Sequence, residues 1–301
     1  MAKTKKTPEL SLPDQPTDSI RLADWLEIYA LISANGNASR GDLESALRRA
    51  SVFQSDESTE IEETLLKVFL ELEDRSAATG DGYPFEIKGN LLKLRPELKK
   101  FSAYIFCLVL SYFGWQAKKG AKINPQDLFE ELSCNAAKHY IQGEVFPFGP
   151  NAANRKGFKE AVAALCNALG EGQGFKDQPT FQRKDDKVDL VAWKVFRDRR
   201  TSKLVMFGQC ASGNNWKDKF AELQPEPFWD QWMQDTKISP LIRSFYVPHR
   251  VDRAQWDYTA RRTGLLFDRC RIAYWAASAP EIQKDSRYLR WSKSFLSIRS
   301  R

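Results

Sequence analysis

Two apolar segments joined by a charged turn constrain the fold of this chain more than any other feature. Residues 188–193 and 203–210 are apolar on both faces, a pattern typical of strands in the middle of a covered sheet. If the turn between them is centred on Arg199, Asp189 lies directly opposite Gln209 in the hairpin. Each strand then carries one polar side chain at the same end of the pair.

The pair Asp189 and Gln209 has two interpretations. A carboxylate among apolar neighbours is costly unless an opposite charge compensates it, and a divalent cation held by oxygen ligands supplies that charge. Alternatively, Asp189 caps the strand end and Gln209 satisfies a backbone group. A helix predicted over 155–170 carries a further carboxylate, Glu160, and this favours a metal site.

The segments around the hairpin predict an α/β domain with a mixed central sheet flanked by helices. Asn124-Pro125 begins a helix upstream, and residues 143–154, rich in Gly, Pro and Asn, predict a loop. A weak strand over 177–183 precedes the hairpin. After the hairpin we expect a helix over 217–234, a strand over 241–247, a helix over 253–263, a strand over 264–267 and a helix ending near 278.

Three pieces of this region carry a resemblance to a known family. Gly157 to Val162, Asp185 to Ala192, and the dipeptide Gln209-Cys210 resemble the Mrr-type branch of the PD-(D/E)xK restriction-endonuclease-like superfamily. The resemblance covers about residues 155–220 and implies a restriction-endonuclease-like core. It also implies a nuclease that depends on Mg²⁺, for which Mn²⁺ can substitute.

The resemblance assigns a role to each polar residue of the predicted site. It implies that Glu160 and Asp189 bind Mg²⁺, that Gln209 is the third polar group, and that the Cys210 carbonyl assists the metal. One residue departs from the family pattern, because the family's lysine falls at Ala211. That lysine activates the attacking water or holds charge that develops on the phosphate. Either another residue replaces it or the site is inactive.

A replacement for the missing lysine is available close by. We expect Lys217, at the start of the helix over 217–234, to take this role, with Lys219 and Lys187 as alternatives. Between Cys210 and Lys217, the small polar residues Asn214 and Asn215 suit a loop that cradles a phosphate. They equally suit an ordinary helix cap with Asn215 as the N-cap.

The net charge of +7 is concentrated in the last third of the chain. Residues 241–301 hold 13 Lys and Arg against 5 Asp and Glu, so a polyanion is expected to contact this region. The expected partner is nucleic acid, and we expect DNA. The arginines assigned to phosphate contact are Arg250, Arg253, Arg261 and Arg262.

The N-terminal part has the opposite charge. Helices over 20–33, 40–50 and 59–75, followed by a hairpin over 83–94, predict a mainly helical, winged-helix-like domain over 18–97. Residues 41–75 hold 10 acidic against 4 basic side chains, which is unsuited to reading a DNA groove. We therefore expect this domain to contact a protein partner.

The rest of the sequence sets the domain boundaries and the compartment. Residues 1–17 predict a disordered tail, 98–142 connecting helices, and 143–301 the nuclease-like domain. The five cysteines are scattered without a Cys-x-x-Cys spacing, which argues against a disulfide framework or a zinc site. No segment is apolar enough to span a membrane and no secretory signal is present, so we expect a cytoplasmic protein.

Two functions follow from these expectations. The first is a Mg²⁺-dependent nuclease, an endodeoxyribonuclease subunit of a restriction or antiphage defence system. The second is a catalytically inactive nuclease-fold module that binds nucleic acid or a partner protein, which the absence of the motif lysine favours.

Overall fold

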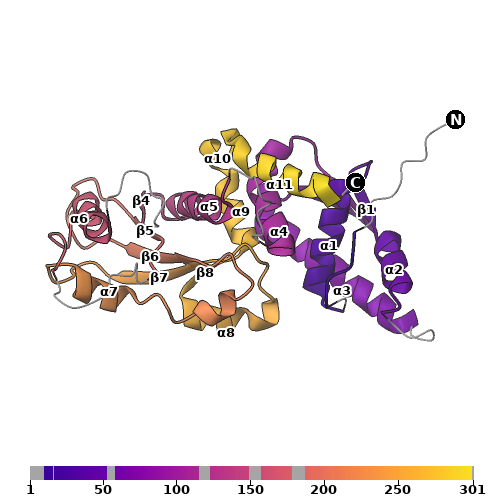
Figure 1. Cartoon of the computed structure of the whole chain (residues 1–301), viewed down its shortest axis with the longest axis horizontal. Helices are drawn as coiled ribbons and strands as arrows, with labels where there is room; N and C mark the ends of the chain where they lie inside the picture. Colours follow the sequence, from indigo (N-terminus) through magenta and orange to yellow (C-terminus); the bar gives the residue numbers. More distant parts are fainter. Residues whose placement is uncertain are drawn as a thin grey trace. The chain divides into compact units, whose positions relative to one another are not determined.

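The chain consists of two compact units in the computed structural model. Unit 1 comprises Met1–Gln116 and Arg269–Arg301, and unit 2 comprises Ala117–Asp268. Figure 1 draws the chain coloured along its sequence. The structure describes residues 10–15, 17–52, 58–114, 123–148, 157–177 and 187–299.

Unit 1 combines helices with a small antiparallel sheet in the order β1-β3-β2. Its strands are β1 (Asn37–Ser39), β2 (Phe85–Lys88) and β3 (Leu91–Leu94), and 3-10 turns occur at Gly80–Gly82 and Leu98–Phe101. Its helices are α1 (Ser19–Ile32), α2 (Arg40–Arg49), α3 (Ser58–Thr79), α4 (Ser102–Phe113), α9 (Arg269–Ala277), α10 (Pro280–Lys284) and α11 (Ser286–Arg299).

Local capping explains where the first helices begin. The carboxylate of Asp18 accepts the backbone N–H of Ile20 at the start of α1. Ser39 and Asp42 form a capping box at the start of α2. The predicted hairpin over 83–94 is confirmed as β2 and β3, whereas α3 continues about one turn beyond its predicted end at 75.

The C-terminal segment belongs to unit 1, which differs from the predicted nuclease-like domain over 143–301. Its helices pack on α4, where the ring of Phe106 makes edge contacts with Tyr288 and Trp291 of α11. The predicted connecting segment 98–142 is also divided, because α4 belongs to unit 1 and the next helix to unit 2. Long-range packing of this kind leaves no local signal in the sequence.

Most of the predicted disordered tail 1–17 lies outside the described residues. Two of the residues that are described contact helices α1 and α4. The indole N–H of Trp25 donates to the carbonyl oxygen of Leu10, and the hydroxyl of Tyr112 donates to that of Ser11.

Unit 2 is an α/β domain with a mixed five-stranded sheet, as the sequence predicts. The strand order is β4-β5-β6-β7-β8, antiparallel from β4 to β6 and parallel from β6 to β8. The strands are β4 (Glu144–Pro147), β5 (Leu190–Trp193), β6 (Val205–Cys210), β7 (Leu241–Tyr246) and β8 (Leu265–Phe267). The helices are α5 (Pro125–Ile141), α6 (Phe158–Leu169), the 3-10 helix η3 (Trp216–Lys219), α7 (Pro225–Trp232) and α8 (Arg253–Thr263).

The predicted register of the central hairpin is confirmed. Leu190 pairs with Gly208, and Arg199 in the turn has a left-handed backbone with φ of 54°. The regular pairing ends at Leu190, because the N–H of Asp189 also donates to the carbonyl oxygen of Gly208, so the expected pairing of Asp189 opposite Gln209 is not seen. Val188 and Val191 lie in the same core cluster, so the alternation of faces is interrupted at this point, as in a β-bulge.

Both faces of this sheet are covered. Alternate residues of β5 and β6, such as Val191 and Phe207, pack in one core cluster with apolar residues of α6 and α7. Figure 1 shows α5 on the other side of the sheet from α7 and α8. Gly208 is required on its face, because a Cβ there would lie 2.8 Å from side-chain atoms of Leu190 and Tyr246.

Two local predictions in unit 2 differ from the structure. The predicted loop over 143–154 contains strand β4, and the predicted helix over 217–234 is two helices, η3 and α7, because Pro225 begins a new helix. The weak strand over 177–183 falls mostly outside the described residues. Among the helices that are described, none combines the length and apolar character needed to cross a membrane.

Candidate functional site

The candidate site lies at the end of the β5–β6 hairpin, where Asp189 immediately precedes β5. The Asp189 carboxylate oxygen Oδ2 accepts the backbone N–H of Cys210 at 2.6 Å. The backbone of Asp189 is also paired on both sides, since its N–H donates to Gly208 and its carbonyl accepts the N–H of Phe148. The side chain therefore extends the pairing of β5 with β6 by one residue.

Gln209 is buried and its side chain is bonded away from the backbone. Its amide nitrogen Nε2 donates to the Glu222 carboxylate at 2.6 Å, and Glu222 lies between η3 and α7. The Gln209 amide therefore bonds a side chain, whereas the alternative interpretation expected it to satisfy a backbone group. This bond holds the Glu222 carboxylate at the end of β6.

Cys210 lies among acidic groups on the α5 side of the sheet. Burial raises the pKa of its thiol well above the usual range, and the negative charges of Asp189 and Glu130 act in the same direction. Glu130 belongs to α5, and Cys134 one turn later also contributes to this raised pKa. The carboxylates of Asp189 and Glu130 thus both lie close enough to influence the same thiol.

The predicted helix ligand Glu160 is placed differently. It is exposed in the first turn of α6, and its carboxylate folds back over Gly157, where a Cβ would lie 2.9 Å from Glu160 Oε2. Across the described residues, no group of three or more His, Cys, Asp or Glu side chains is arranged to hold a metal ion. The predicted set Glu160, Asp189 and Cys210 is therefore not assembled as a cluster.

Two of the candidates for the missing lysine, Lys217 and Lys187, are exposed on the surface of unit 2. Ala211, at the family's lysine position, is fully buried. Lys217 donates from Nζ to Gln255 Oε1 at 3.0 Å and lies 5.6 Å from the centroid of the Trp216 ring. Lys187 is exposed, with a positive φ of 60°.

The residues predicted to contact nucleic acid differ in accessibility. Asn214 and Asn215 are exposed, and Asn215 precedes η3 without a side-chain cap bond, so the cap interpretation is not what the structure shows. Arg250 is mostly buried, and its Nη1 donates to the buried Asp268 carboxylate at 2.8 Å. This ion pair occupies the guanidinium that we expected on a phosphate.

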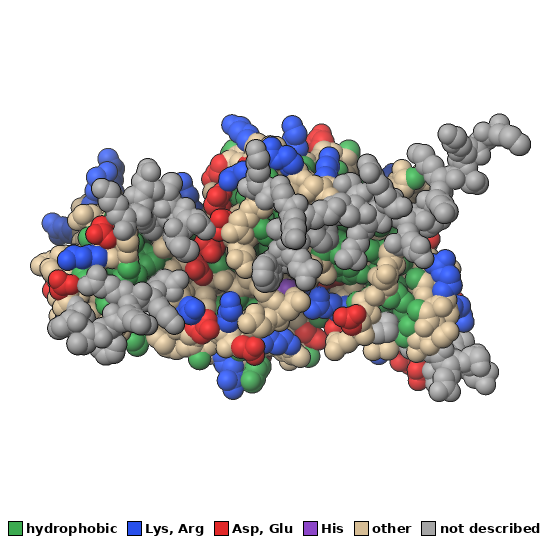
Figure 2. All heavy atoms as spheres, viewed as in Figure 1, with side chains coloured by type: hydrophobic (Ala, Val, Ile, Leu, Met, Phe, Trp, Pro, Cys, Tyr) green, Lys and Arg blue, Asp and Glu red, His purple; other side chains and the backbone are tan. Residues whose placement is uncertain are grey.

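The other three predicted arginines, Arg253, Arg261 and Arg262, are exposed on α8. Figure 2 shows blue side chains with red ones among them in the region where Figure 1 labels α8. The side chains of these three arginines are therefore solvent-exposed, which makes them accessible to a polyanion.

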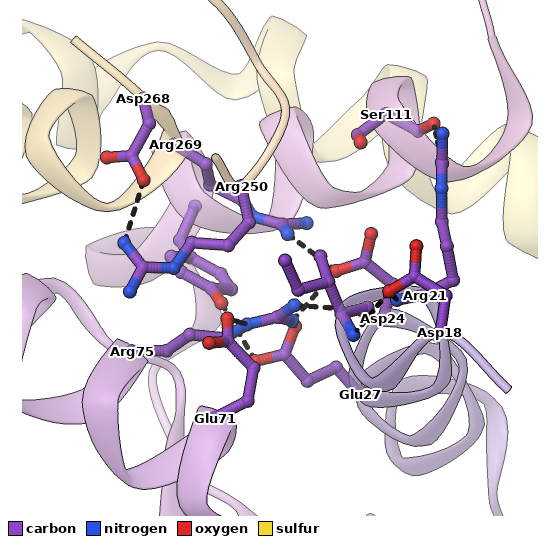
Figure 3. A network of polar contacts seen from close by, with 12 residues as sticks. Asp18, Arg21, Asp24, Glu27, Glu71, Arg75, Ser111, Arg250, Asp268 and Arg269 are labelled. Carbon is purple, nitrogen blue, oxygen red and sulfur yellow. Dashed lines mark hydrogen bonds and ion pairs between the residues drawn. The ribbon is translucent and has the colours of Figure 1, made fainter. Parts of the chain in front are cut away.

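A second polar cluster, in unit 1, is fully buried. Arg75 donates from Nη1 to Asp24 at 2.7 Å and to Glu27 at 2.8 Å, and Arg269 reaches Asp24 at 2.5 Å. Figure 3 shows Arg75 of α3 lying between the two carboxylates of α1. The hydroxyl groups of Tyr83 and Tyr104 donate to Glu27.

The two carboxylates of this buried network respond differently to it. Burial favours the neutral form of Asp24, but the guanidiniums of Arg269 and Arg75 outweigh it and lower the pKa of Asp24. For Glu27 burial prevails over Arg75 and Arg269, and its pKa is raised. Arg75 of α3 and Arg269 of α9 both pair with Asp24 of α1, so the network connects the three helices, although Nε and Nη1 of Arg269 are buried without a hydrogen-bond partner.

Sequence reasoning missed Glu130 and Glu222. Glu130 lies in a helix that the sequence predicts, but helical periodicity alone does not tell which helix faces the end of the hairpin. Glu222 lies where an uninterrupted helix was predicted, and the Pro225 signal for a new helix start could have placed it in a loop beside the sheet.

Comparison of the chain with protein-family models, with curated proteins and with solved structures returned no match.

Proposed function

We propose that unit 2 is a Mg²⁺-dependent nuclease domain that hydrolyses phosphodiester bonds, within an endodeoxyribonuclease subunit of a restriction or antiphage defence system. The observation that carries this proposal is the end of the β5–β6 hairpin, where the Asp189 carboxylate accepts the N–H of Cys210 and the charges of Asp189 and Glu130 both act on the Cys210 thiol. The resemblance of residues 155–220 to the PD-(D/E)xK superfamily supports the same conclusion and supports a restriction-endonuclease-like fold.

The residues at this end of the sheet fit a magnesium ion. Mg²⁺ takes oxygen ligands, keeps several waters and is usually held by one or two carboxylates together with substrate phosphate oxygens. Asp189 and Glu130 offer two carboxylates, whose charges both act on the Cys210 thiol. We assign the helix carboxylate to Glu130 in place of Glu160, whose side chain folds over its own helix start.

When bound, the ion would supply a water of lowered pKa and stabilise charge on the phosphate. The chain's own residues position the groups around it. The N–H of Cys210 fixes the position of Asp189 Oδ2 at the end of the hairpin. Glu222 fixes the amide of Gln209 through Nε2, and because the amide group is planar this bond also constrains the direction of the Gln209 oxygen.

Lys217 is the residue that we propose in place of the family's lysine. Its ammonium bonds Gln255 on α8 and would have to leave this partner to reach a phosphate. A lysine in this position stabilises negative charge as a point charge.

For unit 1 we propose a winged-helix-like domain that binds a protein partner. The order α1-β1-α2-α3-β2-β3 supports the fold. The exposed side of α3 carries acidic residues such as Glu62, Glu63 and Glu73, which disfavours contact with DNA phosphates.

The second candidate function is an inactive nuclease-fold module that binds nucleic acid or a partner protein. Three observations favour it. Ala211 is buried where the family has lysine, Asp189 is bonded to a backbone N–H, and Gln209 is bonded to Glu222.

Cleavage of plasmid DNA and of single-stranded circular DNA with Mg²⁺ or Mn²⁺ separates the two candidates. The nuclease proposal predicts cleavage by the wild-type chain and none by Asp189→Asn. Asp198→Asn is the matched control, since Asp198 is an exposed acid in the turn at the other end of the same hairpin. Absence of cleavage by wild-type protein that still binds DNA supports the inactive module.

A further inference from the structure

The outer face of α8 exposes an aromatic ring to solvent. Tyr258 is 57% exposed, and the guanidinium carbon of Arg262 lies 4.4 Å from the centroid of its ring. The two residues are four apart, so they are neighbours on one face of the helix. The Arg262 guanidinium holds the ring in place by a cation–π contact, although the ring buries little apolar surface against the protein.

Positive charge continues along the same face of α8. Arg261, which is exposed, follows Tyr258 by three residues, and Gln255 precedes Tyr258 by three residues, so both lie on the face of α8 that carries Tyr258. Gln255 holds the ammonium of Lys217, which adds a cation from η3 at the first turn of α8. The acid at that turn, Asp252, has its carboxylate engaged by the backbone N–H of Ala254 as the helix N-cap.

The beginning of α8 lies at the same edge of the sheet as the candidate site. Strands β6 and β7 are parallel, so the segments that follow them leave from one edge. His249 after β7 contacts the carbonyl oxygen of Gly213 after β6 at 3.3 Å, and the two segments lead into α8 and η3. A strand of nucleic acid lying along α8 would therefore lead to the edge of the sheet at which β6 ends.

We infer that this face of α8 binds nucleic acid with unpaired bases, with Tyr258 stacking on a base and Lys217 and Arg261 holding phosphates. Stacking on exposed aromatic rings and basic side chains along the backbone are the two ways in which proteins hold single strands without reading sequence. In a duplex the bases already stack on one another, so an exposed ring gains little from contacting it. The inference rests on the proposed function, because it names the substrate class of that site.

The test measures binding without cleavage. A fluorescein-labelled oligothymidylate of about ten nucleotides is titrated with the full chain in EDTA, and its anisotropy gives Kd. We expect Tyr258→Ala to weaken binding about tenfold, the loss typical of one stacked base, and Tyr258→Trp to retain it. Tyr274→Ala is the matched control, because Tyr274 is an exposed tyrosine of unit 1, 48% exposed, and its removal is expected to leave Kd unchanged.

Tyr258 is on the surface, so its substitution is not expected to unfold the chain, and the circular dichroism of each variant checks this. The inference is overturned if Tyr258→Ala binds the single strand as tightly as the wild type, or if only the duplex is bound. It stands, and the nuclease proposal fails, if the wild type binds through Tyr258 but does not cleave with Mg²⁺. Cleavage that is unaffected by Tyr258→Ala, with unchanged Kd, overturns this inference alone.

Discussion

The side chain of Asp189 replaces a backbone carbonyl in the pairing of β5 with β6, because its Oδ2 accepts the N–H of Cys210 at 2.6 Å. This bond gives Asp189 a structural role in addition to the proposed catalytic one. The two roles depend on different properties, since the bond needs an acceptor oxygen and the metal needs negative charge.

The structural role of Asp189 is tested by the free energy of unfolding of two variants. Asp189→Ala leaves the partly buried Cys210 N–H without its partner and is expected to lower the free energy of unfolding by about 1–3 kcal/mol. Asp189→Asn retains an acceptor oxygen, so its loss is expected to be smaller. Urea denaturation measures both, and equal stability of Asp189→Ala and the wild type would contradict this role of the bond.

The helix carboxylate is tested by comparing two glutamates. Glu130→Gln is expected to raise the Mg²⁺ concentration needed for half-maximal DNA cleavage, because Glu130 acts beside Asp189. Glu160→Gln is expected to leave it unchanged, because that side chain folds over Gly157. The reverse pattern in a Mg²⁺ titration would return the role to Glu160.

Removal of one charge from the buried network of unit 1 is predicted to lower the free energy of unfolding strongly. Asp24→Asn leaves Arg75 and Arg269 without a shared counter-charge and is expected to lower the free energy of unfolding by about 3–5 kcal/mol. Glu44 pairs with Arg48 on the exposed side of α2, so Glu44→Gln is expected to change it by less than about 0.5 kcal/mol. Similar losses for the two variants in chemical denaturation would contradict the role of the network.

The same network predicts how stability depends on pH. The pKa of Asp24 is lowered from 3.8, so its contribution is present above that value and is lost as the pH falls through the lower, folded-state pKa. The pKa of Glu27 is raised from 4.5, so its contribution is full below 4.5 and is lost as the pH rises through the raised pKa.

Denaturation at a series of pH values checks both signs. Stability of the wild type is expected to rise as the pH falls from about 7 towards the raised pKa of Glu27, and to decline in the acid range where Asp24 takes up a proton. Glu27→Gln is expected to remove the rise on the neutral side. A rise of the same size in this variant would show that Glu27 is not its source.

Much of the fold was predictable because its signals are local. The caps at Asp18, Ser39 and Asn124 mark helix starts within a few residues. The register of β5 and β6 followed from a turn centred on Arg199. Alternation and turn position fix which residues of a regular hairpin face one another, as they do here from Leu190 to Trp193.

The remainder depended on contacts between distant parts of the chain. Strand β4 is four residues long and pairs with β5 about 45 residues later, so its pattern was hidden in a segment that reads as a loop. The return of α9 and α11 to unit 1 depends on Arg269 meeting Asp24 and on aromatic contacts of Phe106.

The candidate site was predicted in part for the same reason. The pairing of β5 with β6 came from the position of the turn, which is local, but the turn does not reveal that Asp189 leaves this register and bonds Gly208. The identity of the helix carboxylate depended on how two helices pack on the sheet, and periodicity does not contain this information.

The most direct test of the account is cleavage of plasmid DNA and of single-stranded circular DNA by wild type and by Asp189→Asn in Mg²⁺, with folding of both verified by circular dichroism. The account predicts cleavage by the wild type that is lost in Asp189→Asn and retained in Asp198→Asn. Cleavage by a folded Asp189→Asn protein at the wild-type rate would contradict it.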